Sequence, residues 1–116
     1  MINYHKELVA ALNTIGIGVH YELSLTADTK TPCISYQERN NYIREAGNTL
    51  CYSVIVYTIT VWGNDLAAIQ ENSLKVDNVL RPLGWKRTSS QELHDINSTM
   101  IRKIMTYECL ALEQFN

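Results

Sequence analysis

The sequence has little cysteine, and its cysteines are not spaced as disulfide partners. Its 116 residues contain three, Cys33, Cys51 and Cys109, an odd number with no two close together. This pattern excludes a disulfide framework as the source of stability and argues against a structural zinc site. All three lie in segments with strand character, where an unpaired cysteine usually packs as a small buried hydrophobic residue. We therefore expect a protein that folds in a reducing compartment.

Long apolar runs and concentrations of positive charge are also missing. No apolar run approaches the ~20 residues that span a bilayer, and residues 1–7 lack the charged-then-apolar layout of a signal peptide. Ten Lys and Arg residues stand against twelve Asp and Glu residues, for a formal net charge of −2, and the basic residues are scattered. Phosphate binding needs clustered Lys and Arg. We expect a protein made in a cytoplasm, without a membrane segment and without sequence-specific nucleic-acid binding.

The length and the apolar spacing indicate one domain, residues 1–116, with two helices. A chain of this size buries roughly two-thirds of its unfolded surface and needs no covalent staples. Residues 2–15 carry apolar side chains at helical spacing, and Gly16 is placed to cap that helix. Asn64 is placed as the N-cap of a second helix, which Pro82 and Gly84 end. Its predicted apolar stripe is Leu66, Ile69, Val76, Leu80 and Leu83, with Ser73 in the same register.

The longest predicted strand runs from Leu50 to Trp62, with largely apolar residues on both faces. Such a strand is expected at the centre of a sheet and covered on both sides for much of its length. At about 3.3 Å per residue it would reach roughly 43 Å and overhang the core of so small a domain. Other strands are predicted over 19–23, from Cys33 outward, over 85–88 and over 100–112, with a loop over 89–98. The fold class is α+β: a mainly antiparallel sheet with long hairpin strands and two helices packed on one face.

Residues with catalytic or metal-binding chemistry are dispersed along the chain. His5, His20 and His94 share no local frame in which a metal could be bound. His94 and Asp95 are adjacent, and neighbouring side chains on an extended chain point in opposite directions, so they cannot easily serve one another. The cysteines have no basic neighbour or helix N-terminus that would lower a thiol pKa. We predict no catalytic residue, no metal and no cofactor.

The hairpin before the longest strand has a polar tip. Residues 37–41 are polar, and residues 45–48 give a turn signal. Exposed strands with unpaired backbone groups are ready partners for another chain. We therefore predict that the tip contributes to assembly and not to the core. The candidate interface residues are Gln37, Arg39, Asn41, Tyr42, Arg44 and Asn48.

Four stretches together resemble the small tail-completion or tail-terminator proteins of long-tailed bacteriophages and prophages, over nearly the whole chain. They are Leu12–Ile17 at the end of the first helix, Thr31–Tyr36 at the entry to the hairpin, Tyr52–Trp62 with the helix end Val79–Arg87, and His94-Asp95 before Arg102–Glu108. The resemblance implies a homo-oligomeric ring, commonly a hexamer, that caps the tail tube and joins it to the head connector. It also implies a virion location at the head-proximal end of the tail, assembly in the bacterial host cytoplasm, and no enzymatic activity.

Two other functions stay open. One is a small α+β ligand-binding or regulatory domain that dimerises through its sheet. The other is a small enzyme that uses His94 with a cysteine or a serine. Oligomer size separates the first two functions, because a hexamer or visible rings would favour the tail protein. A stable dimer that binds a metabolite would favour the regulatory domain.

Overall fold

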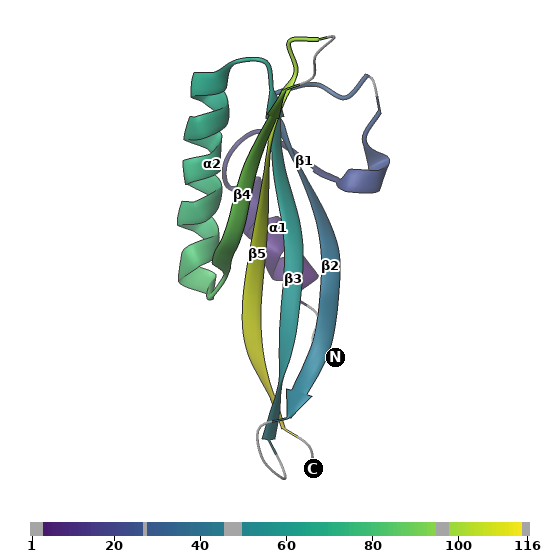
Figure 1. The fold of residues 1–116 in the computed structure, drawn as a ribbon, viewed down its shortest axis with the longest axis vertical. Coiled ribbons are helices and arrows are strands. Elements are labelled where there is room, and N and C mark those ends of the chain that lie inside the picture. Colours follow the sequence, from purple (N-terminus) through teal and green to yellow (C-terminus); the bar gives the residue numbers. More distant parts are fainter. Residues whose placement is uncertain (1–3, 27, 46–49, 95–97, 115–116) are drawn as a thin grey trace.

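Two helices, five strands and two short 3-10 turns make up the described part of the chain (Figure 1). The computed structural model describes residues 4–26, 28–45, 50–94 and 98–114. The elements are α1 (His5–Asn13), β1 (Gly18–Tyr21), η1 (Glu22–Ser24), β2 (Cys33–Glu45), β3 (Leu50–Gly63), α2 (Leu66–Leu80), η2 (Arg81–Leu83), β4 (Lys86–His94) and β5 (Ile101–Gln114). The α+β class and the order of helices and strands are as predicted.

The strands form one sheet in the order β1-β2-β3-β5-β4. The long strand β3 lies at its centre, as predicted, and runs one residue further than expected, to Gly63. It pairs antiparallel with β2 on one side and with β5 on the other. Only the short strand β1 breaks the antiparallel pattern, since it pairs parallel to the first four residues of β2. The prediction of a mainly antiparallel sheet with long hairpin strands is confirmed.

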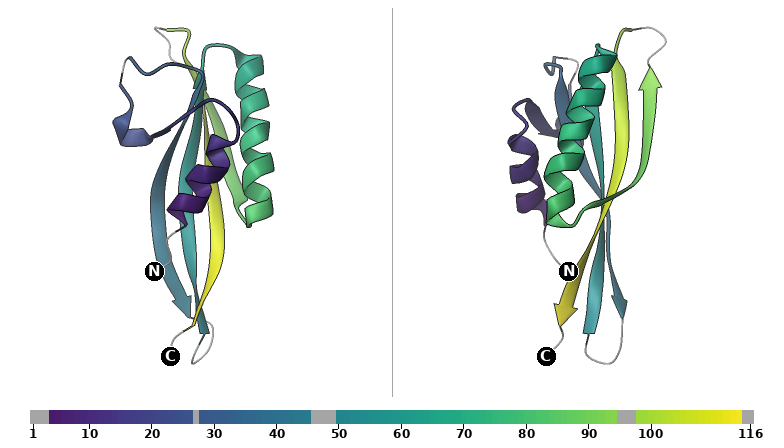
Figure 2. Two further views of the ribbon diagram at one scale, coloured as in Figure 1. Left: turned by 180° about the vertical axis from the view of Figure 1, so that it is seen from behind. Right: turned by 90° about the vertical axis from the view of Figure 1, so that its left-hand side faces the viewer.

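Both helices pack on the same face of the sheet (Figure 2), so the fold has two layers. The prediction that β3 is covered on both sides is confirmed, but neighbouring side chains, and not helices, cover its second face. On the face without helices, Thr58 and Thr60 are buried all the same. Side chains on the same face reach across to shield and bond them: Arg39 Nε donates to Thr58 Oγ1 at 2.8 Å. One strand away, Trp62 Nε1 donates to Ser35 Oγ at 2.9 Å.

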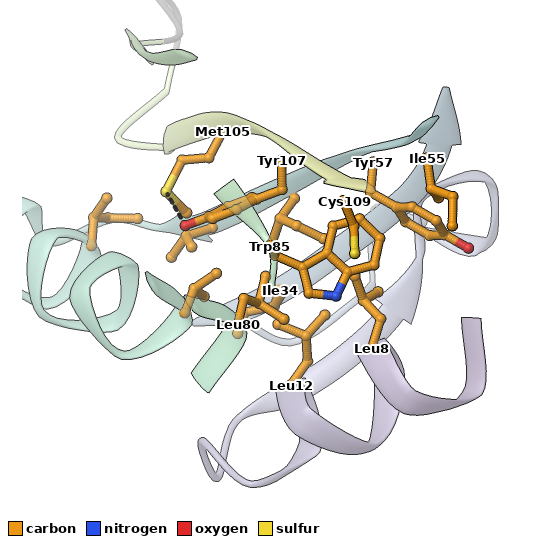
Figure 3. Packing of buried hydrophobic residues seen from close by; sticks show 14 of the residues in the cluster. Leu8, Leu12, Ile34, Ile55, Tyr57, Leu80, Trp85, Met105, Tyr107 and Cys109 are labelled. Carbon is orange, nitrogen blue, oxygen red and sulfur yellow. Dashed lines mark hydrogen bonds between the residues drawn. The ribbon is translucent and has the colours of Figure 1, made fainter. Parts of the chain in front are cut away.

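The core lies between the helices and the helix-facing side of the sheet (Figure 3). Leu8 and Leu12 of α1 point into it, as the helical spacing predicts. Trp85 stands edge-on to Tyr57, with ring centroids 5.5 Å apart. The remaining buried members are Ile34, Ile55, Ile59, Val61, Ile69, Val76, Leu80, Ile101, Met105, Tyr107, Cys109 and Ala111. Strand alternation places the β3 and β5 members on one face.

The helix ends differ slightly from expectation. The predicted N-cap of α2 at Asn64 is wrong by one residue, because the Asp65 carboxylate accepts from the backbone N–H of Ala67 at 3.2 Å. Both residue types are good N-caps, so the sequence alone does not choose between them. The C-cap of α1 is Thr14, and Gly16 adopts its left-handed conformation, φ +96°, two residues later. The predicted stop of α2 is confirmed by the left-handed Gly84 at φ +92°.

Two predicted boundaries in polar segments are wrong. Residues 89–94, predicted as a loop, belong to strand β4, which pairs with β5. As an edge strand exposed on both faces, β4 needs no apolar alternation, and its pairing rather than its composition makes it a strand. The strand predicted over 19–23 ends at Tyr21, where Ser24 Oγ donates to the Tyr21 carbonyl at 2.7 Å and closes a 3-10 turn.

Candidate assembly surface

The lower ends of β2, β3 and β5 extend beyond both helices as a three-stranded ribbon (Figures 1 and 2). We call this ribbon the strand overhang: residues 40–45, 50–56 and 108–114, whose inner end still contributes Ile55, Cys109 and Ala111 to the core. Its cause is a difference in rise per residue. The 14 residues of β3 span about 46 Å, whereas the 15 residues of α2 span about 22 Å. The molecule accordingly measures 54 × 25 × 22 Å, and the predicted overhang is confirmed.

Both outer edges of the overhang lack a partner strand within the described residues. On one side, β1 pairs only with Cys33–Tyr36, which leaves the edge of β2 from Gln37 to Glu45 open. We call this stretch the β2 free edge. On the other side, the pairing of β4 ends opposite Glu108, which leaves β5 open from Cys109 to Gln114. We call that stretch the β5 free edge. Each presents backbone N–H and C=O groups that a further strand can pair with, apart from the Asn41 N–H, which donates to Asn40 Oδ1 at 2.9 Å.

Five of the six predicted interface residues lie on the β2 free edge, and they divide into two groups. Asn48 lies outside the described residues. Arg39 is the extra residue of a bulge between Glu38 and Asn40. Its Nη2 lies 3.5 Å from Glu22 Oε2, in addition to its bond to Thr58, so it anchors the hairpin to the body of the protein. Gln37 is half-buried opposite Thr58.

The other group lies further out, on the overhang itself. The Asn41 side-chain amide donates to Glu38 Oε1 at 3.4 Å and stays close to its own strand. Tyr42 and Arg44 are exposed on the face without helices, with the guanidinium carbon 5.8 Å from the centre of the tyrosine ring. Tyr42 and Arg44 are therefore the predicted interface residues best placed to meet another molecule.

Sequence reasoning missed one residue that the structure brings into this surface. Leu110 is 61% exposed on the β5 free edge, and Tyr42 is 37% exposed on the β2 free edge. Val54 pairs with Tyr42 on one side and with Leu110 on the other, so the three form one apolar row across the overhang. The alternation in the sequence places Leu110 on the opposite face of its strand from Met105, Tyr107 and Cys109. Only the strand pairing shows that β4 does not extend along β5 as far as Leu110.

The surface of the described chain includes two hollows of similar size. The first, of about 290 Å³, is lined by Leu25, Thr26, Thr29, Thr31, Cys33, Trp62 and Met100. The second, of about 310 Å³, is lined by Gly84, Lys86, Thr88, Glu108 and Leu110. The first has no charged side chain in its lining and so offers a small ligand only hydroxyl and apolar contacts. The second lies where β4 ends and the β5 free edge begins.

The residues with reactive side chains lie apart from one another. No group of three His, Cys, Asp or Glu residues in the described part of the chain could hold a metal ion. His94 Nε2 lies 3.4 Å from Glu92 Oε2 on the exposed strand β4, and Asp95 is outside the described residues. Burial raises the pKa of Cys33 and of Cys109, the latter also through the charge of Glu7. Both thiols therefore stay protonated near neutral pH and are poor nucleophiles.

The side chain of Cys51 lies outside the described residues. Among the helices of the described chain, neither is long and apolar enough to cross a membrane. The arrangement that stands out is thus the strand overhang, which can form contacts through backbone hydrogen bonds and exposed apolar side chains.

No family model matches the chain, and no curated protein matches it. In fold, the chain is similar to one from the virion of a native gene transfer agent (GTA) particle, with a TM-score of 0.64. That likeness covers 93% of this chain and 91% of the other, at 11% sequence identity. At this identity the likeness shows a shared fold, and the coverage shows that the whole domain takes part in it.

Proposed function

We propose that this chain is a structural assembly protein of a phage or phage-like virion. It forms a ring, a hexamer in the family that it resembles, at the head-proximal end of the tail. There the ring caps the tail tube and joins it to the head connector. The observation that carries the proposal is the strand overhang, whose two free edges lie on opposite sides of one ribbon.

The two free edges suit the geometry of a ring. A closed ring needs two different, complementary patches on each subunit, so that each copy binds the next one around. The β2 free edge and the β5 free edge are such a pair of distinct patches, one on each side of the same copy. A dimer through the sheet would need only one of them.

The fold likeness to a virion chain supports the same proposal, because it spans nearly the full length of both chains. The dispersion of histidines and the raised thiol pKa values support contact over catalysis. The alternative, a ligand-binding regulatory dimer, could use the 290 Å³ hollow, but the described lining of that hollow carries no charged group to orient a metabolite.

The first test is the mass of the native assembly, by native mass spectrometry and light scattering, together with electron microscopy. Six chains of 13.3 kDa have a mass of about 80 kDa. We expect that mass, and rings, either in solution or at one end of added tail tubes from the same particle. A stable dimer that leaves tube ends bare would contradict the proposal.

A second test uses variants at the tip of the hairpin. Deleting Gln37–Thr49, which we predict to leave a folded monomer, would also remove the bond between Arg39 and Thr58. The double substitution Tyr42→Ser with Arg44→Ser disturbs the outer surface alone. We expect it to abolish rings while the circular dichroism spectrum and the melting temperature stay close to those of the wild type.

The matched control replaces one exposed leucine and one exposed cation on the outer surface of α2, as Leu74→Ser with Lys75→Ser. Lys75 makes only a surface ion pair with Glu71, at 3.6 Å, which contributes little to stability. The control should keep its rings. Rings lost in the control and kept in the tip variant would place the subunit contact on the helices.

A further inference from the structure

We propose that copies of this chain join by parallel strand pairing, with the β5 free edge of one copy hydrogen-bonded to the β2 free edge of the next. Tyr42 of one copy then packs on Leu110 of its neighbour, beside the hollow where β4 ends. The inference rests on the proposed ring and deepens it by naming the strands and side chains that close each contact.

Strand direction determines that this pairing is parallel. β2 runs antiparallel to β3, and β3 runs antiparallel to β5, so β2 and β5 point the same way. Rotation about a ring axis along the strands keeps that direction from one copy to the next. The outer edge of β2 already accepts a parallel strand, since β1 pairs with its first four residues. The neighbour's β5 would continue along the same edge, with Cys109 and the residues after it beside Asn41 and the residues after it.

The exposed apolar side chains lie where this pairing would bury them. Tyr42, Val54 and Leu110 occupy one cross-strand row on the face without helices. The row begins and ends in an exposed side chain, one at each free edge. Joining two copies edge to edge extends the sheet with the same face outward, so Leu110 of one copy meets Tyr42 of the next. Each pair of copies thereby covers two apolar groups that are left in water in the single chain.

The hollow at the Lys86 end of β4 gives the incoming strand room. The pairing of β4 with β5 reaches no further along β5 than Glu108, which lies opposite Lys86, and the hollow of about 310 Å³ opens beside Leu110. Its lining combines the apolar Leu110 and the hydroxyl of Thr88 with one positive and one negative side chain, Lys86 and Glu108. A tyrosine, which combines an apolar ring with a hydroxyl, suits such a surface.

A two-fold dimer makes a different prediction from the same edges. A two-fold axis joins a patch to its own copy, so the β2 free edge would meet another β2 free edge, or β5 another β5. Those contacts are antiparallel, and they bring Tyr42 close to Tyr42 or Leu110 close to Leu110. Cysteine crosslinking between chosen positions distinguishes the two arrangements.

The experiment uses two single variants of the full chain, Tyr42→Cys and Leu110→Cys, each also carrying Cys51→Ser, treated with a short bismaleimide and separated on a denaturing gel. We expect no crosslink in either variant alone and a crosslinked dimer when the two are mixed. The double variant should give a ladder that ends at the ring size. The wild type, whose Cys33 and Cys109 are buried, is treated in the same way as background. Where rings form only on tail tubes, the variants are bound to tubes before treatment.

A pair of leucines supplies a second measurement that does not depend on crosslinking. Leu110 is 61% exposed and Leu74 is 65% exposed, so replacing either by lysine should leave the fold intact. We expect Leu110→Lys to raise the protein concentration needed for assembly at least tenfold. Leu74→Lys should leave that concentration unchanged. The reverse result would overturn the edge pairing, as would a crosslink in either single cysteine variant.

The outcomes separate this inference from the proposed function. Rings without a crosslink between positions 42 and 110 would overturn the edge pairing but not the proposal that the ring caps the tail tube. A crosslinked open polymer that does not bind tail tubes would support the edge pairing and contradict the proposal that the chain caps the tube.

Discussion

Removing a single hydroxyl tests how α2 is held against the sheet. Tyr107 is fully buried in β5, and its hydroxyl donates to Asp77 Oδ1 of α2 at 2.9 Å. The other carboxylate oxygen of Asp77 accepts from Arg81 Nη2 at 2.9 Å, and the Asp77 side chain is 14% exposed. Tyr107→Phe keeps the ring in the core and removes the hydroxyl that joins this strand to this helix.

The expected loss follows from the chemistry of that bond. A hydrogen bond to a charged group contributes roughly 1.5–3 kcal/mol to stability. Asp77 keeps its partner Arg81 and some contact with water after the substitution, so the lower end of this range applies. We expect Tyr107→Phe to lower the free energy of unfolding by about 1.5 kcal/mol and the melting temperature by about 6 °C for a domain of this size.

The chain offers a matched control in the direct cross-strand partner of Tyr107. Tyr57 is also buried on the helix-facing side, but its hydroxyl lies 3.4 Å from His5 Nδ1, a long contact that contributes little. Tyr57→Phe should lower the free energy of unfolding by less than about 1 kcal/mol. Urea unfolding, monitored by circular dichroism, measures the free energy of unfolding of both variants. The comparison holds if their m-values equal that of the wild type. Equal losses would refute the idea that the bond to Asp77 holds α2 in place.

Two further predictions concern proton release and helix capping. Burial, with smaller repulsion from Glu38, raises the pKa of Tyr57 to about 12, whereas an unfolded tyrosine releases its proton near pH 10. Stability should therefore be complete below about pH 10 and fall as the pH rises toward 12, and Tyr57→Phe should flatten that fall in urea titrations. Asp65→Ala should lower the free energy of unfolding by about 1 kcal/mol and Asn64→Ala by clearly less, because the Asp65 carboxylate bonds the helix N-terminus; equal effects in urea unfolding would contradict this assignment.

The parts of the fold that were predicted correctly depend on local patterns. Alternation along β3 and β5 marked both as strands, and helical spacing marked Leu8, Leu12, Val76 and Leu80 as buried. Such periods follow from backbone geometry within a few residues, so they can be read without knowledge of partners. The turn signal at Gly84 held for the same reason, since a left-handed residue ends a helix locally.

The parts that were mispredicted depend on partners distant in the sequence. β4 is a strand because β5 lies beside it, although its own residues are polar and exposed. The surroundings of Arg39, a predicted interface residue, also depend on distant residues, because a bulge turns its side chain toward Thr58 and ties it to the body. A bulge shifts the register by one residue, which the alternation of side chains in one strand does not reveal.

The candidate surface shows the same division. The sequence by itself determined that β3 is longer than a small core can cover, because rise per residue and strand length are local quantities. It also determined that the hairpin tip is polar. Only the tertiary structure decided which edges stay open, since an edge is defined by the absence of a neighbouring strand among the described residues. Strand order arises from long-range pairing, and it alone places Tyr42 and Leu110 at opposite ends of one row.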